Sequence, residues 1–495
     1  MVWMKQKVII IGAGFGGLSC AITMAAKGWD VTILERQSTI GGKLQQIQAE
    51  GYTFDRGPST ITMPNVFRDV FEQVGVRMED YVELYELEPR SRNIFADGSR
   101  VDLSRDIHRM EDQIATYSPS DALNYAAYIR EAEALYQQAE DQFMNKLLLT
   151  WKDKADVAML RSLLRVRPFT TLQCLLKRYF THPNTLAMFG RYATYVGSSP
   201  YQAPSIFAML GHVEAKNGVF GVRGGTYQLV EGMARLAREL GVKIVTNTEV
   251  IQIKVTHGRT TGVETHNGFY EAPMIVANGD VLNVNRMLIH EKDRPSMRND
   301  KIAKYEPSLS GFVTLAGVAQ QYSKLLHHTV FFPDKYEPEF RNIFERKLTP
   351  AHPTIYVCYS GFSEQGMAPE GGSNLFILAN APSLSACLDW GKEKQIYGDQ
   401  VLSTLSQHGL TGIDKGDVLK YYTPEDIASD NLAYKGSIYG ISSNSVGQTF
   451  SRPSNRSKDI EGLWYVGGTT HPGGGTPMVT LSGRLVGEYI TEHMV

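Results

Sequence analysis

The chain has 495 residues, of which 42% are hydrophobic and 21% are charged. This length predicts two or more domains, because a single hydrophobic core stops growing at about 250–300 residues, and the ordinary composition excludes long disordered tails. A formal net charge of −2 excludes a general attraction to nucleic acid, so no nucleic-acid partner is expected. The four cysteines are scattered without a C-x-x-C pair, which argues against a disulfide framework or a zinc site, and no metal is predicted.

In chain order, the first predicted elements form one βαβ unit. Residues 8–11 are a short apolar run typical of a buried parallel strand, and a glycine-rich loop follows at 12–17. Small and apolar residues at 18–27 then predict a helix that ends at Gly28, and residues 31–34 predict the next parallel strand.

The residue patterns in the rest of the chain predict three regions with different secondary structure. Residues 84–215 are expected to form a helical insertion, 216–300 return to an α/β pattern, and 301–454 contain β-branched runs that predict an antiparallel, substrate-binding sheet. The predicted fold class is therefore α/β combined with α+β. A discontinuous Rossmann-type domain would comprise residues 1–83, 216–300 and 455–495.

The glycine loop indicates a dinucleotide site. Gly12 permits the tight turn, Gly14 permits close approach of a pyrophosphate, and Gly17 permits close packing of helix on strand. Glu35 stands at the end of the second strand, where a carboxylate accepts hydrogen bonds from ribose hydroxyls. This carboxylate would repel a 2′-phosphate and so disfavours NADP, but the unit alone leaves NAD and FAD open.

Two further segments add candidate cofactor contacts. A second glycine pair with flanking cations follows the ribose carboxylate, and a constrained turn that could run under a flavin ring follows about ten residues later. These candidates are Arg36, Gly42 and Lys43 in the first segment, and Gly57, Pro58 and Ser59 in the second.

These motifs resemble the carotenoid (phytoene) desaturase family of FAD oxidoreductases. The shared features are the βαβ unit, the E-R-x(4)-G-G-K pattern at 35–43, the F-D-x-G-P pattern at 54–58, and the H-P-G-x-G-x-P signature at 471–477. The resemblance implies FAD as the cofactor and a long apolar carotenoid as the substrate. It also places Gly468, Pro477, Met478 and Val479 beside the flavin and Val250 beside the adenine. The start of the helix near Met478 would direct a positive dipole at the flavin.

Within this family, two reactions remain open. Residues 195–199, 327–332 and 480–483 look most like the diaponeurosporene (diapolycopene) oxidases, which convert a terminal methyl group of a C30 carotenoid to an aldehyde. Residues 224–227 and 368–370 look equally like diapophytoene desaturases, which introduce double bonds. We expect the oxidase reaction and keep desaturation as the alternative. Neither the oxygen source nor the oligomeric state is predicted.

The histidines provide no firm catalytic residue. A polyene delocalises the positive charge left when hydrogen is removed beside it, so no strong protein base is required. His471 is the single candidate, although Pro472 suggests that it mainly shapes a turn. His327 and His328 are expected to have a surface or structural role, since adjacent residues of a strand point to opposite faces and make a poor metal pair.

The location of the protein follows from two patterns. No stretch of 18 consecutive apolar residues is present and no secretory signal is evident, so a cytoplasmic protein without a spanning helix is expected. The segment 151–180 mixes cations with apolar residues and predicts peripheral association with the inner face of the cell membrane, from which an insoluble substrate would enter.

Two alternatives from other classes are weaker. A non-catalytic prenyl-lipid carrier on the same scaffold would not need the cofactor motifs that this chain retains. An amine oxidase is disfavoured because no aromatic pair is evident beside the final glycine turn.

Overall fold

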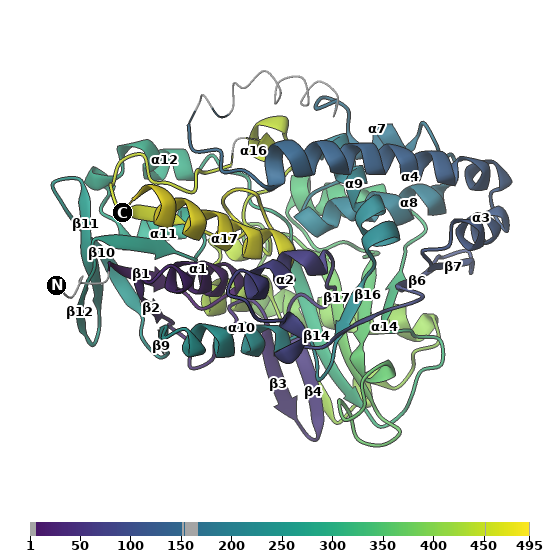
Figure 1. The fold of residues 1–495 in the computed structure, drawn as a ribbon. Coiled ribbons are helices and arrows are strands. Elements are labelled where there is room, and N and C mark those ends of the chain that lie inside the picture. Colours follow the sequence, from purple (N-terminus) through teal and green to yellow (C-terminus); the bar gives the residue numbers. More distant parts are fainter. Residues whose placement is uncertain (1–5, 151–152, 154–166, 451, 495) are drawn as a thin grey trace.

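The computed structural model describes residues 6–150, 153, 167–450 and 452–494. They form a mixed α/β fold built around a five-stranded parallel sheet and a seven-stranded mixed sheet. The parallel sheet lies at the left of Figure 1 and the larger sheet at the lower right, with a group of helices above the larger sheet (Figure 1).

The parallel sheet confirms the predicted βαβ unit. Strand β1 (Lys7–Ile11) pairs in parallel with β2 (Asp30–Leu34), and helix α1 (Phe15–Ala26) connects them. The strand order is β19-β13-β1-β2-β9. Strands from the middle and the C-terminal part of the chain therefore complete the parallel sheet that β1 and β2 begin. The remaining strands are β9 (Lys243–Val245), β13 (Met274–Ala277) and β19 (Leu463–Tyr465).

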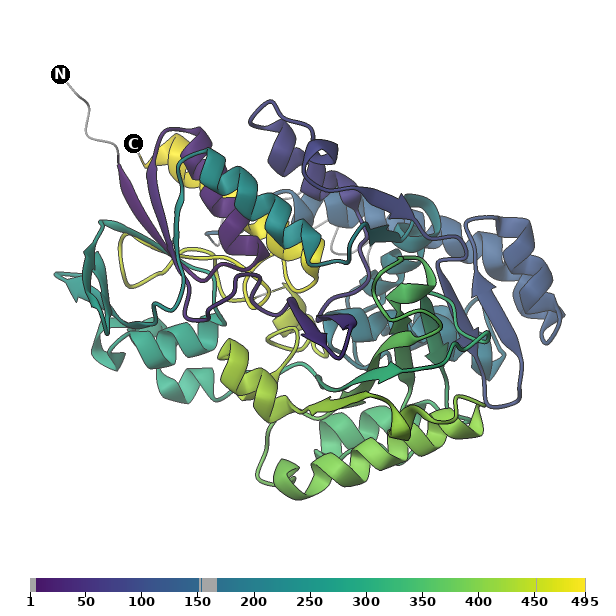
Figure 2. The same ribbon diagram turned by 90° about the horizontal axis from the view of Figure 1, so that it is seen from below.

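One face of this sheet is covered by three helices that lie beside one another (Figure 2). These are α1, α10 (Gln228–Glu239) and α17 (Thr476–His493). Helices α1 and α17 approach each other closely, because a Cβ atom at Gly483 would lie only 2.1 Å from the carbonyl oxygen of Gly16. Only glycine permits this contact, which holds the two ends of the chain together.

The opposite face packs against a smaller antiparallel sheet and a short helix. Apolar residues of the parallel strands, such as Ile9 and Ile275, share one core with Ile253, Val263 and Leu282. The elements concerned are β10 (Val250–Thr256), β11 (Arg259–Thr265), β12 (Gly268–Glu271) and α11 (Val281–Leu288).

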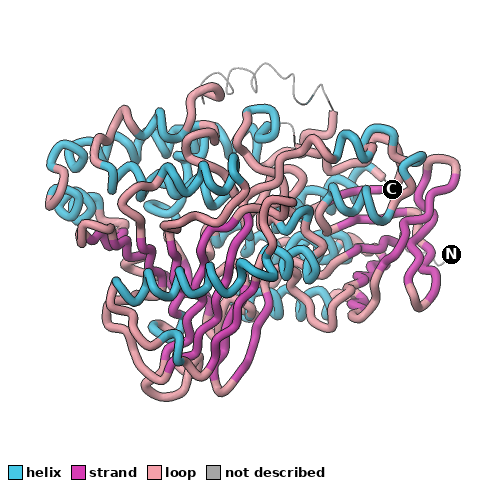
Figure 3. The backbone as a smooth tube through the Cα atoms, turned by 180° about the vertical axis from the view of Figure 1, so that it is seen from behind, coloured by secondary structure: helices cyan, strands magenta, loops and turns pink. Residues whose placement is uncertain are grey.

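The large sheet has the order β18-β14-β17-β16-β15-β6-β7. Its pairs are antiparallel except β15 with β6, which run parallel, so the predicted antiparallel sheet is confirmed with one exception. Helix α14 (Trp390–Gln407) lies across one face, where Phe312 and Ile377 join its core, and Figure 3 shows this helix from behind. The strands are β6 (Ser91–Ile94), β7 (Arg100–Leu103), β14 (Ser310–Val318), β15 (His328–Phe331), β16 (Ile355–Tyr359), β17 (Ser373–Ala381) and β18 (Val418–Tyr422).

The other face of the large sheet packs against the helical region. The helices are α3 (Ile107–Ala115), α4 (Pro119–Ala139), α7 (Leu172–Leu176), α8 (Pro183–Gly190) and α9 (Met209–His212). Side chains such as Val313 and Phe376 of the sheet share a core with Tyr128 of α4 and with Phe180, which follows α7.

The prediction of a helical insertion beginning at residue 84 was wrong for its first part. Residues 84–103 form β5 (Leu84–Glu86), which pairs with β8 (Phe220–Val222), and then β6 and β7, which extend the large sheet. β6 and β7 form a local hairpin, but β8, the partner of β5, and β15, the second partner of β6, lie far along the chain, so the local pattern carries no sign of those two pairings.

Short elements connect these layers. A hairpin of β3 (Gln45–Ala49) and β4 (Tyr52–Arg56) precedes α2 (Pro64–Glu72), and the later short helices are α12 (Asn299–Ile302), α13 (Glu337–Phe340), α15 (Pro424–Asn431) and α16 (Val446–Phe450). The 3₁₀ and π segments are η1 (Met78–Asp80), η2 (Glu140–Met144), η3 (Arg191–Val196), η4 (Ser205–Ala208), η5 (Val213–Asn217), η6 (Glu291–Asp293), η7 (Pro295–Met297), η8 (Arg341–Arg346), η9 (Ser360–Phe362), η10 (Ile413–Lys415) and η11 (Tyr434–Gly436).

Within the described part of the chain, no helix is both long enough and apolar enough to cross a membrane.

Candidate functional site

A cavity of about 620 Å³ runs between the parallel sheet, the large sheet and the helical region. Every sequence-predicted cofactor residue except Gly17 lines it: Gly12, Gly14, Glu35, Arg36, Gly42, Lys43, Gly57, Pro58, Ser59, Val250, Gly468, Pro477, Met478 and Val479. Gly17 lies behind the wall, where a Cβ atom would approach the Gly12 carbonyl oxygen to 2.2 Å. This contact agrees with the packing role that the sequence predicts for Gly17.

The glycine turn presents helix α1 to the cavity. Gly12 has a φ of +96°, and its N–H donates to the Leu34 carbonyl at 2.8 Å, which fixes the turn beside β2. Gly14 caps the helix without a side-chain contact. The first N–H groups of a helix have no partner within the helix, so this end is suited to an anionic group such as a pyrophosphate.

Glu35 is fixed at the carboxyl end of β2. Its Oε2 accepts the Ala13 N–H at 2.8 Å and its Oε1 accepts the Gln37 N–H at 2.9 Å. Each oxygen retains acceptor capacity, because a carboxylate oxygen has two lone pairs. The residue is 7% exposed and lines the cavity, so its carboxylate is positioned to accept hydroxyl groups of a bound sugar.

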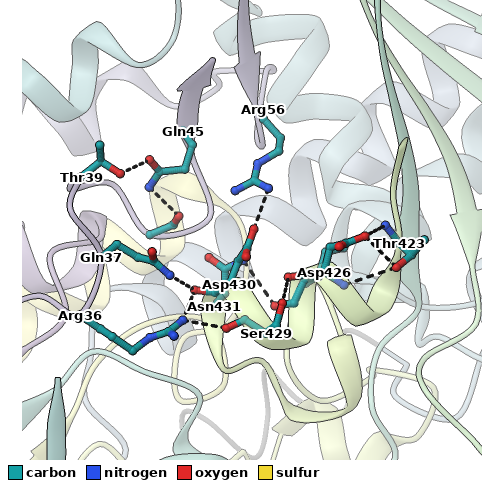
Figure 4. Close-up of polar contacts among 12 residues, drawn as sticks. Arg36, Gln37, Thr39, Gln45, Arg56, Thr423, Asp426, Ser429, Asp430 and Asn431 are labelled. Atoms are coloured by element: carbon teal, nitrogen blue, oxygen red, sulfur yellow. Dashed lines mark hydrogen bonds and ion pairs between the residues drawn. The ribbon is translucent and has the colours of Figure 1, made fainter. Parts of the chain in front are cut away.

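Three cations line this end of the cavity; Arg36 and Lys43 donate to backbone carbonyls and Arg56 to a carboxylate. The Arg36 guanidinium donates to the Ser429 and Asp430 carbonyls of α15 at 2.7 and 2.6 Å, and Arg56 forms an ion pair with Asp430 at 2.8 Å (Figure 4). Lys43 donates to the carbonyls of Ser437 and Ile438. Its pKa is lowered to about 8 by burial, against the opposing effect of Asp280. Arg36 therefore ties α15 to this end of the cavity.

Sequence reasoning missed three polar residues that help to build the site. Asn278 Nδ2 donates to the Gly12 carbonyl at 3.2 Å, and Asp280 caps α11 through Oδ1 while its buried Oδ2 has no hydrogen-bond partner among the described residues. Arg452 is buried, which lowers its pKa to about 10, and it donates to the Gly468 carbonyl at 3.2 Å. All three line the cavity. The position of Asn278 and Asp280 just after the buried strand β13 was the available signal.

The C-terminal signature forms the wall next to the glycine turn, since a Cβ atom at Gly16 would lie 3.0 Å from the Val479 carbonyl oxygen. Helix α17 begins at Thr476 after Gly475, which has a φ of +103° and provides no side-chain cap. Its positive end therefore faces the cavity, in agreement with the predicted helix near Met478. His471 lines the same wall, with Nε2 at 2.8 Å from the Lys146 carbonyl and its own carbonyl accepting from Asn455 and Ser482. These contacts fit the turn-shaping role.

Beyond the C-terminal signature, the cavity continues as a mainly apolar chamber. Its walls come from the helical region and from the inner face of the large sheet, through Phe143, Met144, Leu148, Ile206, Phe207, Leu210, Val213, Leu309, Val313, Phe376, Leu378 and Ile438. A few polar side chains also contribute to the walls, namely Arg191, Tyr195, Tyr356 and Asn380. The chamber suits a long apolar ligand whose reacting part lies beside the C-terminal signature.

The expectation that His327 and His328 point to opposite faces was wrong, and neither lies on the surface. His327 precedes β15 and is outside the strand alternation, and the two ring centroids lie only 4.6 Å apart. Both residues are buried, with exposed fractions of 6% and 2%.

The described residues contain the features that a flavin dinucleotide needs. Two helix N-termini face one cavity, a fixed carboxylate stands at its sugar-binding position, and the buried acceptor Asp280 Oδ2 lacks a protein partner. The residues present therefore fit FAD.

Comparison with known proteins agrees with this geometry. The sequence model of one family, described as flavin containing amine oxidoreductase, matches residues 15–491. The chain is similar to 4,4′-diapolycopene oxygenase of Methylomonas sp (34% identical over 494 residues, 99% of both chains). It is also similar to 4,4′-diaponeurosporene oxygenase of Staphylococcus haemolyticus (33% identical over 492 residues, 98% of this chain and 97% of the relative).

Among solved structures, an oxidoreductase from Methanosarcina mazei has the same fold, with a TM-score of 0.63 at 14% identity over 98% of this chain and 100% of the other. The family match extends over nearly the whole chain. The flavin in the family's description agrees with the cavity described above, and the solved structure agrees with the fold. We conclude that the chain belongs to the flavin containing amine oxidoreductase family and is an FAD-dependent oxidoreductase.

Proposed function

We propose that this protein oxidises the terminal methyl group of a C30 carotenoid to an aldehyde. One observation carries the proposal: a single cavity joins the dinucleotide end to an apolar chamber. A conjugated C30 chain is long, apolar and without polar groups, and such a chamber would bury it. The names of the relatives, diapolycopene oxygenase and diaponeurosporene oxygenase, support the same substrate class.

The residues that would hold the cofactor follow from their places in the cavity. In the proposed Rossmann-type domain, the α1 N-terminus with Gly12 and Gly14 would hold the pyrophosphate, Glu35 the ribose, and Val250 the adenine. Gly57, Pro58, Ser59, Gly468, Pro477, Met478 and Val479 would surround the flavin. When bound, FAD would supply two-electron oxidations; conversion of a methyl group to an aldehyde removes four electrons, so two rounds would be needed, with the alcohol as the product of the first.

The protein's own contribution to the reaction would be positioning and exclusion of water. The apolar walls would keep the end of the polyene in near contact with the cofactor, and the polyene itself would delocalise the positive charge that forms. No strong base is required, which agrees with the contacts of His471 to backbone groups. The positive end of α17 would stabilise negative charge on the reduced cofactor.

We further propose that the protein associates peripherally with the inner face of the cell membrane, from which the substrate would enter. Half of the segment that motivates this proposal, residues 151–152 and 154–166, lies outside the described residues. Phe169 at its described end supports the proposal, because it is 89% exposed.

The reaction is tested by supplying purified, FAD-loaded protein with diaponeurosporene and, separately, with diapophytoene, and analysing the products by mass. We expect replacement of two hydrogens by one oxygen in diaponeurosporene, and parallel reactions under ¹⁸O-labelled dioxygen or in ¹⁸O-labelled water would identify the oxygen source. New double bonds in diapophytoene, with no oxygenated product from diaponeurosporene, would contradict the proposal and favour the desaturase reaction.

A further inference from the structure

Three side chains with nitrogen or sulfur ligand atoms meet in the protein interior, outside the cofactor site. His328 is the first residue of β15 and lies directly opposite Cys358 of β16, while His327 immediately precedes β15. The ligand atoms of all three residues lie within 4.8 Å of one another. The exposed fractions of His327, His328 and Cys358 are 6%, 2% and 6%, so bulk water does not solvate the cluster.

Only one of the two ring nitrogens of His328 has a hydrogen-bond partner among the described residues. His328 Nδ1 lies 2.8 Å from the Tyr356 hydroxyl, which lies 2.6 Å from the Ser59 hydroxyl, whereas Nε2 has no hydrogen-bond partner among the described residues. If Nδ1–H donates to Tyr356 and Tyr356 donates to Ser59, Nε2 carries a bare lone pair. A histidine that binds a metal is commonly fixed in this way by a donor contact of its other nitrogen.

His327 also has a ring nitrogen without a hydrogen-bond partner in the described part of the chain. Its Nδ1 is buried and also has no partner among the described residues. Each histidine of the cluster thus has one buried nitrogen without a hydrogen-bond partner within the described residues, and an unprotonated imidazole nitrogen is the atom that binds a metal ion.

We propose that His327, His328 and Cys358 form a binding site for one transition-metal ion of the kind that accepts thiolate and imidazole ligands, represented by Zn²⁺. This proposal replaces the sequence-based expectation of no metal and is independent of the proposed carotenoid reaction. Two imidazoles and one thiolate are a suitable ligand set for such an ion. In tetrahedral zinc sites the ligand atoms are roughly 3.5 Å apart, so side-chain adjustments of about 1 Å would close the cluster around an ion.

A small cavity beside the cluster leaves room for one water molecule as a fourth ligand. Its volume is about 10 Å³, close to that needed for one water molecule, and its lining includes His327, Cys358, Ser59, Asp55 and Glu364. Cys358 would bind the ion as a thiolate, so binding would be accompanied by release of the thiol proton. The buried carboxylates in the same cavity would add negative charge near the cation.

The site would act on the cofactor cavity through the hydrogen-bonding chain. Tyr356 and Ser59 both line the cofactor cavity, and they connect it to His328. A bound ion would fix the orientation of the His328 imidazole and, through it, the hydroxyl groups of Tyr356 and Ser59. Tyr356 is thus a positioning residue in this proposal.

The test begins with metal analysis of full-length, FAD-loaded protein, incubated with Zn²⁺ and dialysed against metal-free buffer. We expect about one zinc per chain by mass spectrometry, and zinc-edge X-ray absorption should show one sulfur and two imidazole ligands in the first coordination shell. Co²⁺ in place of Zn²⁺ should give the d–d bands of a tetrahedral thiolate site at wavelengths beyond those of oxidised flavin.

Variants locate the site. His327→Gln and Cys358→Ala should lose at least about nine-tenths of the metal, whereas the matched controls His408→Gln and Cys20→Ala, at residues outside the cluster, should retain it. Flavin content and the Tm show which variants are folded; should the cluster variants fail to fold, the sulfur and imidazole ligands of the wild type decide alone. Wild-type protein that retains neither Zn²⁺ nor Co²⁺, or metal bound without sulfur, would overturn the proposal.

Discussion

At the scale of single residues, the cofactor end of the cavity depends on one position where a side chain is absent. A Cβ atom at Gly14 would lie 3.2 Å from Asn278 Nδ2 and 3.9 Å from both the Gly41 carbonyl oxygen and Gly42 Cα. Larger branched groups there would fill the space between three segments that line the cavity and would keep a pyrophosphate away from the α1 amides.

We therefore expect Gly14→Val to lower the flavin-to-protein ratio of the purified enzyme at least about tenfold. The ratio of flavin to protein absorbance measures this. Gly447→Val is the control, because a Cβ atom at Gly447 meets nothing within 4 Å. Full FAD occupancy in Gly14→Val would show that this loop does not hold the cofactor.

Glu35 provides the second prediction at this scale. Glutamine at position 35 retains an acceptor for the Ala13 or Gln37 amide but loses the charge, and hydrogen bonds to charged groups are worth about 1 kcal/mol more than neutral ones. The Kd of FAD for the apoprotein should rise about tenfold in Glu35→Gln. Fluorescence titration measures the Kd, with the exposed Glu72→Gln as the matched control. An unchanged Kd would remove Glu35 from the ribose site.

At the scale of elements, the segment 151–180 is the candidate membrane contact, and its described end refines the choice of residues. Arg167 forms an ion pair with Glu131 at 3.1 Å, so its charge is already partnered within the protein. Phe169 is exposed and adds an apolar contact. The segment is therefore better tested through Arg161, Arg165 and Phe169 than through Arg167.

We expect Phe169→Glu, and separately charge reversal at Arg161 and Arg165, to weaken binding to anionic liposomes several-fold, since each charge near an anionic surface contributes about 1 kcal/mol. Added salt should also weaken wild-type binding. Flotation with liposomes measures the bound fraction, and Phe269→Glu in β12 is the matched control at another exposed phenylalanine. Equal binding by wild type and both variants would count against this docking surface.

At the scale of the whole molecule, the function depends on how three layers enclose one cavity. The glycine turn and α17 come from the parallel sheet side, and the apolar chamber comes from the helical region and the large sheet. In the proposed arrangement, cofactor binding and substrate binding use different layers, so a change in the chamber is expected to affect the substrate alone.

Leu210→Trp tests this separation, because Leu210 lines the chamber and a larger side chain would obstruct it. We expect a normal flavin content with carotenoid turnover, measured as kcat/KM, reduced at least about tenfold, or about 1.4 kcal/mol of transition-state stabilisation. Leu123→Trp on α4, where Leu123 is 84% exposed, is the matched control. Wild-type turnover in Leu210→Trp would place the substrate elsewhere.

The sequence by itself determined the cofactor end of the protein. The turn at Gly12 to Gly17 and the strand that ends at Glu35 are local structures, set by neighbouring residues and recognisable from their spacing. The C-terminal signature likewise predicted the helix beginning near Met478, because a glycine turn followed by proline is a local start signal for a helix.

Only the tertiary structure decided which distant residues complete the site. The pairing of β6 with β15, the contact of Arg36 with α15, and the meeting of His327 with Cys358 join residues that are far apart in the chain. Hydrophobic periodicity reports which face of an element is buried, but it carries no information about the partner on that face. The cavity that unites the cofactor motifs with the apolar chamber is a product of those long-range contacts.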